Sequence, residues 1–305
     1  MRTNYNIVDR KLIATEQEAC QVTVYANPTD AEKKYLIGQM KLDEHTLASA
    51  LDPDELSRME FEPDHVAIIY KRPKNYSGEE QFLFKVGSVG AYLFKDRLII
   101  VTVDENFLLD EISIALPFSP GGMLLKLSFR SIVHFREHLK IISRISDELQ
   151  NKINTALENR HLLNLFALQK SLVYYLNSLN SNEALLEKLR HNAVRIGLTT
   201  EELEILEDTL IENGQCLKQA NIFSDILAGL MDARASIVSN NLNVLMKTLT
   251  IITIAIMVPT FVVSAFSMNV SMPFDHQHPF AFWIIISMAL LSMIGFLAFW
   301  RIKRW

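Results

Sequence analysis

The pattern of hydrophobic and polar positions changes character twice along the chain. Within residues 1–120, short runs rich in Val, Ile, Phe and Tyr are bounded by turn-forming residues, which is typical of strands. The pattern predicts short helices over Asp43–Leu51 and Pro53–Met59 and strands over Gln21–Tyr25, His65–Tyr70, Gln81–Val86, Gly90–Phe94 and Leu98–Val103. Residues 1–120 are therefore predicted to form a cytoplasmic α/β domain.

After residue 120 the hydrophobic residues recur at helical spacing. This predicts two long antiparallel cytoplasmic helices within residues 121–198, joined at Asn177–Asn182. The run Thr199–Glu202 resembles a capping box, which starts a helix. No proline occurs from Glu201 to Val258, so a single stalk helix is expected over residues 199–266 and across the membrane.

Two uncharged stretches predict two membrane spans. The chain contains no Asp, Glu, Lys or Arg between Lys247 and Asp275, and none between Asp275 and Arg301. About 20 apolar residues cross a hydrocarbon core of about 30 Å, so spans are expected over about 245–266 and 279–300. The loop 267–278 has no Lys or Arg, whereas the tail 301–305 has three bases. The positive-inside rule then predicts a multi-pass protein of the cell (inner or plasma) membrane, with both termini cytoplasmic.

The charge of the chain limits the classes of molecule that it can bind. Residues 1–247 hold 34 acidic and 27 basic residues. This acidity argues against nucleic acid, whose phosphates require clustered Lys and Arg, and fits a part of the protein that meets cations. The sequence contains no Gly-rich phosphate loop and no arrangement of residues typical of a nucleophilic enzyme. We therefore predict that the protein is not an enzyme.

One face of the long helix carries small and polar residues at steps of three and four. Their average step is close to 3.5, which keeps a line of residues facing the axis of a helical bundle. The stripe consists of Asp225, Gly229, Asp232, Ser236, Ser239, Asn243, Met246, Leu249, Thr253, Met257, Thr260 and Ser264. Small residues at membrane depth indicate either close helix packing or the lining of a pore in a symmetric oligomer. Asp232 and Asn243 favour a cation path, with the pore lined from Asn243 to Ser264, because rings of acidic residues attract cations.

The end of the first span resembles a known family. Ser267-Met268-Asn269, followed by Met272-Pro273, is similar to the Gly-Met-Asn signature and following Met-Pro of the CorA family of magnesium channels. The resemblance continues through Asn243–Ile252, Leu230–Ala233, Ser239-Asn240 and, in the first domain, Val89–Val103. Departures are Ser267 in place of the glycine, Pro259 one position later than usual, and a single loop acid, Asp275.

The resemblance implies a homopentameric funnel in the lipid bilayer, with a long stalk helix and two spans per subunit. It implies that Ser267, Met268 and Asn269 form the selectivity filter, where five Asn269 side chains hydrogen-bond the water shell of Mg²⁺. It also places Asp208 at an intersubunit magnesium sensor, and we add Asp232 as a second cytoplasmic cation site. The loop residues Asp275, His276 and His278 are either ordinary solvated loop residues or a candidate site for Zn²⁺ or Ni²⁺, because imidazole suits these ions.

The function predicted on this basis is Mg²⁺ uptake, driven by the membrane potential and gated by cytoplasmic Mg²⁺. One alternative is a zinc, cobalt or nickel transporter of the same family. Another is a divergent homologue with a regulatory role and weak transport, for which Ser267 is the main support.

Overall fold

The computed structural model describes residues 1–8, 11–17, 20–76, 82–104, 119–155, 159–268 and 280–303. The chain divides into two compact units, Met1–Met231 and Asp232–Trp305.

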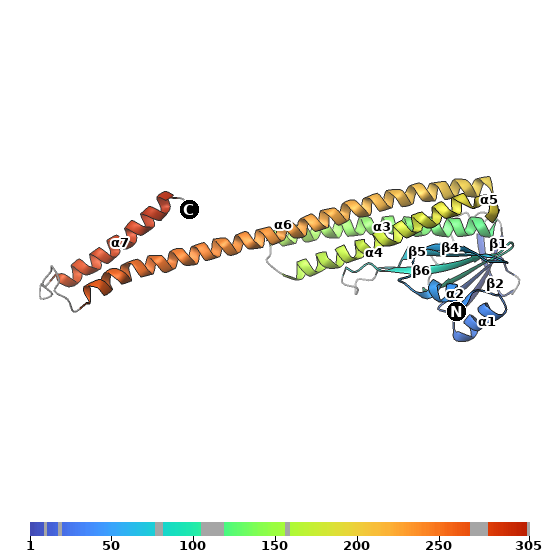
Figure 1. Ribbon diagram of the computed structural model, residues 1–305, viewed down its shortest axis with the longest axis horizontal. Helices are drawn as coiled ribbons and strands as arrows, with labels where there is room; N and C mark the ends of the chain where they lie inside the picture. Colours follow the sequence, from blue (N-terminus) through green and yellow to red (C-terminus); the bar gives the residue numbers. More distant parts are fainter. Residues whose placement is uncertain are drawn as a thin grey trace. The chain divides into compact units, whose positions relative to one another are not determined.

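A seven-stranded sheet organises the first unit (Figure 1). Its order is β2-β1-β3-β7-β6-β5-β4, with β3 and β7 parallel and the other paired neighbours antiparallel. The strands are β1 (Arg2–Val8), β2 (Lys11–Thr15), β3 (Val22–Ala26), β4 (Arg58–Phe61), β5 (Val66–Pro73), β6 (Val86–Leu93) and β7 (Leu98–Thr102). All five residues of β7 are buried, as expected for a central strand covered on both faces.

Alternate residues of β7 enter two separate cores, because successive side chains of a strand point to opposite faces. Ile99 and Val101 join the core beneath α1 (Asp30–Gly38) and α2 (Glu44–Leu51). Leu98 and Ile100 join the larger core on the opposite face. A Cβ on Gly90 of β6 would lie 2.5 Å from Cβ of Ala50, so glycine allows α2 its close approach to the sheet.

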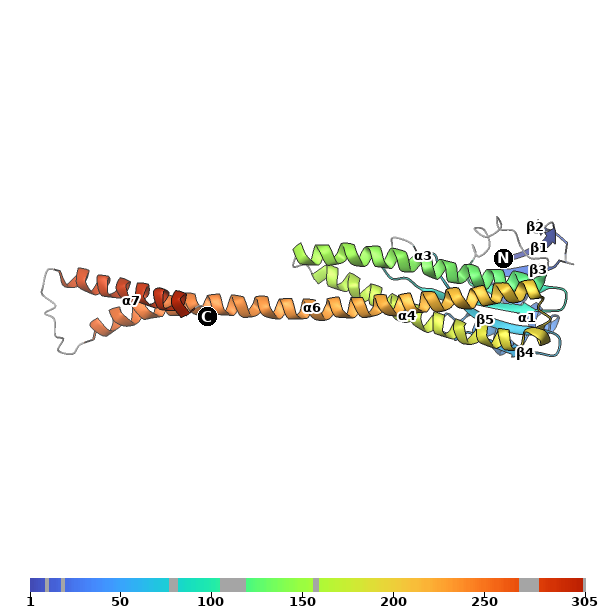
Figure 2. The ribbon, with the colours of Figure 1, turned by 90° about the horizontal axis from the view of Figure 1, so that it is seen from above.

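Long helices build the larger core: α3 (Pro120–Thr155), α4 (Asn159–His191) and the first part of α6 (Thr200–Phe266). Figure 2 shows these helices running side by side over the sheet. The short α5 (Ala193–Ile196) ends at Gly197, whose φ of 86° is left-handed and suits glycine. The predicted capping box is present: the Thr199 N–H donates to Glu202 Oε2 (2.8 Å), and the Glu202 N–H donates to Thr199 Oγ1 (3.3 Å).

The predicted helix connection at Asn177–Asn182 is wrong. This segment lies inside α4, and α3 instead ends at Thr155. Asn182 is buried and joins α4 to the sheet: its Oδ1 accepts from Lys71 N (2.9 Å) and its Nδ2 donates to Lys71 O (3.0 Å). Asn182 therefore makes a contact between α4 and the sheet and does not mark a turn.

Two further predictions of local structure differ from the fold, and one hairpin was missed. Pro53–Met59 forms no helix, and β4 begins within it at Arg58. In the predicted strand Gln81–Val86, Phe82 has a positive φ of 67°, and β6 begins only at Val86. The hairpin of β1 and β2 was not predicted, although Tyr5 and Leu12 bury its inner face, because polar residues interrupt its hydrophobic positions.

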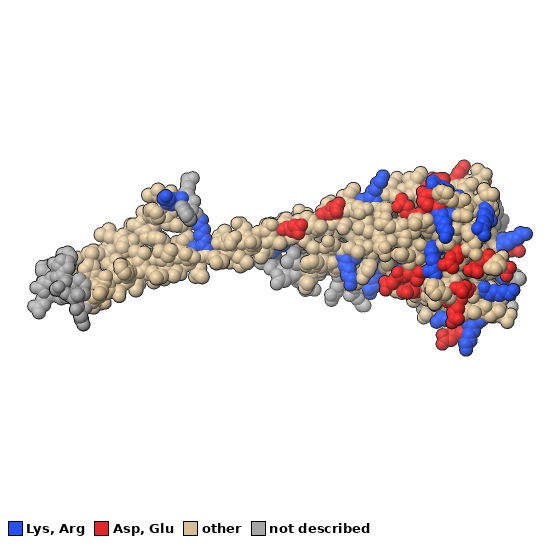
Figure 3. All heavy atoms as spheres, in the orientation of Figure 1, with Lys and Arg blue, Asp and Glu red and all other residues tan. Residues whose placement is uncertain are grey.

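The second unit consists of the remainder of α6 and the helix α7 (Ala281–Lys303). Both helices are long and apolar enough to cross a membrane. Charged side chains are dense on the first unit and sparse on the second (Figure 3). The helix predicted from Glu201 is confirmed as the continuous α6, and α7 covers the second predicted span shifted by two or three residues.

Candidate functional site

The predicted stripe lies uncovered on α6 in the single chain. The seven residues from Asn243 to Ser264 are all exposed. Even the large apolar members remain open: Met246 is 66%, Leu249 66% and Met257 63% exposed. Such an exposed face must contact lipid, a second copy of the chain or water.

The opposite face of α6 is the covered one. Its less exposed residues recur at steps of three and four, at Ile251, Ala255, Val258 and Val262. The matching face of α7 includes Ile285, Ala289 and Phe296. Ala255 and Ala289 are 9% and 7% exposed, and small residues of this kind let two membrane helices approach closely. At about 100° per residue, the stripe lies about half a turn from the face that α7 covers.

This relation between the stripe and α7 was not predicted from the sequence. The apolar positions 251, 255, 258 and 262 carry the signal for it, because they define one side of a helix. The two faces have different composition: the covered face is aliphatic, whereas the open stripe contains Thr253, Thr260 and Ser264.

The hydroxyl groups of the stripe have a defined orientation. Thr253 Oγ1 donates to Leu249 O (2.9 Å), and Thr260 Oγ1 donates to Ile256 O (2.7 Å). Their protons are thus committed to the backbone, and the oxygen lone pairs remain for other donors. The exposed groups that Thr253 and Thr260 offer are acceptors, which suit the outward hydrogens of a hydrated cation.

Only part of the predicted filter is described. Ser267 follows the last residue of α6, and its hydroxyl donates to Ser264 O (2.8 Å), as does its backbone N–H (3.1 Å). Met268 is 58% exposed. Asn269 and the loop residues Asp275, His276 and His278 lie outside the described residues.

The predicted cytoplasmic cation sites are single exposed carboxylates. Asp208 lies in the part of α6 that belongs to the first unit, and Asp232 lies in the second. Among the residues that the structure describes, no group of three His, Cys, Asp or Glu side chains could hold a metal within one chain. A cation at Asp208 therefore requires ligands from outside this set, such as a second subunit.

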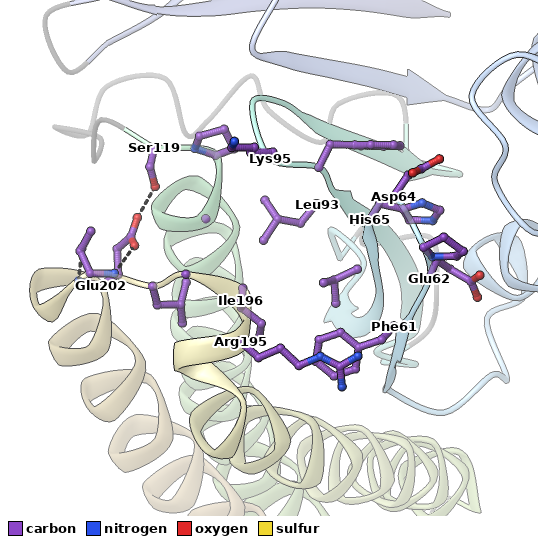
Figure 4. A pocket seen from close by; sticks show the side chains of 18 residues that line it. Phe61, Glu62, Asp64, His65, Leu93, Lys95, Ser119, Arg195, Ile196 and Glu202 are labelled. Atoms are coloured by element: carbon purple, nitrogen blue, oxygen red, sulfur yellow. Dashed lines mark hydrogen bonds between the residues drawn. The ribbon is translucent and has the colours of Figure 1, made fainter.

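A cavity of about 660 Å³ lies within the first unit, between the β4–β5 turn and the starts of α3 and α6 (Figure 4). Glu202 lies buried beside it, bonded to Thr199 N and to the Ser119 hydroxyl. Through these two hydrogen bonds, Glu202 joins the starts of α3 and α6. Its carboxylate is stabilised there because it lies at the N-terminus of a helix. Arg195 stacks on Phe61 at 3.7 Å from the ring centroid.

Two histidines lie one turn apart on α3, where His138 is buried against α4 and His134 is partly buried. His134 Nε2 and His138 Nε2 are 3.0 Å apart, and His138 Nδ1 is 2.6 Å from the Tyr175 hydroxyl. Burial lowers the pKa of His134 to about 4, helped by the cationic Arg72 and Arg130. Burial, with His134 nearby, lowers the pKa of His138 to about 3. Both imidazoles are therefore neutral at physiological pH.

Comparison with known proteins identifies the family. The family model described as "CorA-like Mg2+ transporter protein" matches residues 23–304. The chain belongs to this family. It is 26% identical over 290 residues to the cobalt/magnesium transport protein CorA of Methanocaldococcus jannaschii, covering 92% of this chain and 89% of the relative. It is accordingly a membrane transporter for divalent cations and not an enzyme.

Solved structures share the CorA fold. The complete CorA magnesium transporter from Methanocaldococcus jannaschii matches with a TM-score of 0.84 at 22% identity, over 98% of this chain and 96% of that one. Full-length CmaX matches with a TM-score of 0.70 at 14% identity, over 99% and 97%. The ZntB cytoplasmic domain from Vibrio parahaemolyticus RIMD 2210633 matches with a TM-score of 0.61 at 13% identity, over 78% and 98%.

Proposed function

We propose that the protein is a homopentameric channel for Mg²⁺ uptake, with the α6 stripe lining its pore. The observation that carries this proposal is the exposed polar stripe on the side of α6 away from α7. With five copies around an axis, the stripes meet at the centre and α7 lies outside, against lipid. Such an arrangement gives the uncovered Thr and Ser residues a wet environment, which polar groups at membrane depth need.

Mg²⁺ crosses this pore with much of its water shell. The ion dehydrates reluctantly, and the acceptor oxygens of Thr253 and Thr260 bind water hydrogens without replacing the water. The rings of Met246, Leu249 and Met257 form apolar constrictions, which close by dewetting. A dication moving inward gains about 4.6 kcal/mol per 100 mV of membrane potential, so no nucleotide is required.

At the outer mouth, Asn269 selects the hydrated ion through its neutral side-chain carbonyl. A carboxylate ring would bind the ion more tightly and release it more slowly. Ser267 and Met268 complete the filter, with Ser267 in the place of the family's glycine. Both termini lie in the cytoplasm and the loop outside, because the bases in the last turn of α7 and just after it are retained inside.

Cytoplasmic Mg²⁺ closes the channel by binding between subunits at Asp208 and Asp232. Acidic subunits that face one another repel, and a bound dication removes this repulsion. Loss of the ion lets the subunits separate and widens the apolar constrictions.

Transport of zinc, cobalt or nickel is the second candidate function. The observation that favours it is the His-x-His of the loop, since His276 and His278 with Asp275 would suit a transition-metal ion. The Methanocaldococcus jannaschii relative is a cobalt/magnesium transport protein, which is compatible with transport of Mg²⁺ and with transport of Co²⁺.

Ion flux into liposomes tests the proposal. The protein is reconstituted with an inside-negative potential, and Mg²⁺ entry is followed with a trapped indicator while Co²⁺, Ni²⁺ or Zn²⁺ competes outside. We expect Mg²⁺ entry that rises with the potential and is lost in Asn269→Ala. Zn²⁺ entry without Mg²⁺ entry would favour the second candidate, and no entry of any divalent ion would contradict transport by this chain.

A further inference from the structure

Two lysines mark the open end of the α6–α7 hairpin. Lys247 lies on α6, which ends at Phe266 beside the loop, and Lys303 is the last residue of α7, which begins at Ala281 beside the loop. At about 1.5 Å per residue, the two lysines lie about 28 Å and about 33 Å from the loop end. Both therefore fall at one boundary of a hydrocarbon core about 30 Å thick.

Helical spacing places the two lysines on the sides of α6 and α7 that hold the less exposed residues nearer the loop. Lys247 precedes Ile251 and Ala255 by four and eight residues, so it continues the face of α6 that α7 covers. Lys303 follows Phe296 by seven residues and continues the face of α7 that packs on α6. Arg301 lies about 160° from Lys303 around α7 and leaves the hairpin.

Within the described residues of the second unit, neither lysine has an acidic side chain near it in the sequence. No acidic residue occurs between Asp232 and Asp275 or after Asp275, and the loop that holds Asp275 joins the other ends of the two helices. Within the described part of the chain, neither lysine forms a salt bridge, and both are exposed. Figure 3 shows basic and no acidic side chains at this end of the two helices. Two like charges that face each other repel unless an anion lies between them.

We propose that Lys247 and Lys303 bind the phosphate of an anionic phospholipid between α6 and α7. The depth of the two lysines matches that of lipid head groups, and Lys side chains carry their charge to this interface. Trp300, one turn before Lys303 on the same face, supplies the aromatic contact typical of this boundary. The bound lipid ties the pore-lining helix to α7, and this role does not depend on which ion is transported.

Lipid titration in detergent tests the site. Native mass spectrometry counts the dioleoylphosphatidylglycerol molecules retained by the full-length assembly, with dioleoylphosphatidylcholine and inorganic phosphate as comparisons. We expect phosphatidylglycerol to bind in preference to phosphatidylcholine and inorganic phosphate not to displace it. The double variant Lys247→Gln/Lys303→Gln should weaken phosphatidylglycerol binding by roughly thirtyfold. This is the change expected when the attraction of two lysines to anionic lipid is lost.

Arg301→Gln is the matched control, because it removes one charge at the same depth from the other face of α7. It should weaken binding by less than about fivefold. Equal losses for Arg301→Gln and Lys303→Gln, or displacement by inorganic phosphate, would overturn the proposal. The charge-preserving pair Lys247→Arg/Lys303→Arg should assemble and retain the lipid; loss of the lipid there would show that helix packing, not phosphate binding, had been disturbed.

Discussion

Single hydrogen bonds decide what the stripe presents to a passing ion. Each threonine hydroxyl that bonds to the carbonyl four residues earlier becomes an acceptor on its outer side. Thr253 and Thr260 do so on the stripe, whereas Thr248 makes the same bond, to Val244 O at 2.8 Å, on the side that continues toward α7. The side of α6 on which a threonine lies, and not its residue type, should therefore determine how its substitution changes ion flux.

Thr253→Val removes the acceptor oxygen while keeping the shape of the side chain. Five lost contacts to the ion's water shell, each worth about 0.5–1.5 kcal/mol, should lower Mg²⁺ flux at least tenfold in liposomes. Thr248→Val is the control and should leave flux within about twofold of the wild type. Equal flux in the two variants would contradict a wet stripe.

The two histidines of α3 predict that acid destabilises the first unit. An unfolded histidine titrates near 6.5, whereas burial lowers the pKa of His134 to about 4 and that of His138 to about 3. Between these values the unfolded chain binds protons that the folded chain does not, so stability falls as pH falls through 6.5 toward 4. The thermal midpoint should drop from pH 7.5 to 5.5, and drop less in His138→Gln than in the exposed control His191→Gln. A drop of the same size in both variants would assign it to other groups.

At the scale of elements, the close contact of α2 with the sheet depends on the absence of a side chain at Gly90. Gly90→Ala would place a methyl group 2.5 Å from Cβ of Ala50. Overpacking of this kind costs about 1–3 kcal/mol, which urea unfolding of the purified protein should detect. Gly38→Ala, where nothing lies within 4 Å of the new Cβ, is the control and should be neutral or stabilising. A stable Gly90→Ala would mean that α2 moves away at little cost.

The long elements could be predicted from the sequence because their signals are local. The absence of charge defines the two spans, and the capping box at Thr199 fixes the start of α6. The turn-like composition of Asn177–Asn182 led to the wrong prediction of a helix connection. The hydrogen-bond partner of Asn182 is Lys71, which lies 111 residues away in sequence, so a local pattern could not reveal it. Likewise, the face of α6 that receives α7 is a tertiary property, and helical spacing alone left packing and pore equally open for the stripe.

At the scale of the whole molecule, the proposed pore forms only where copies of the chain meet along α6. In the pentamer that we propose, closure by cytoplasmic Mg²⁺ depends on charges that lie on different subunits. Binding to the closed state alone stabilises it by roughly 1.4 kcal/mol per site at tenfold excess of the ion over its Kd, and five sites give roughly 7 kcal/mol. This is ample to shift a two-state equilibrium.

Asp208→Asn should therefore weaken inhibition of flux by Mg²⁺ trapped inside the liposome. The first unit should also become more sensitive to protease even at high Mg²⁺. Glu204→Gln, one turn earlier on α6 and equally exposed, is the control for loss of a single negative charge. An inhibition curve identical to that of the wild type would make Asp208 an ordinary surface carboxylate.

The position of the pore on α6 is most directly tested by cysteine accessibility. In a background without Cys20 and Cys216, Thr253→Cys places a thiol on the stripe and Ala255→Cys places one on the face that α7 covers. A cationic, water-soluble methanethiosulfonate should modify Thr253→Cys and block Mg²⁺ flux, while Ala255→Cys should stay unmodified with its flux intact. Rapid modification of Ala255→Cys together with an inert Thr253→Cys would contradict a pore lined by the stripe.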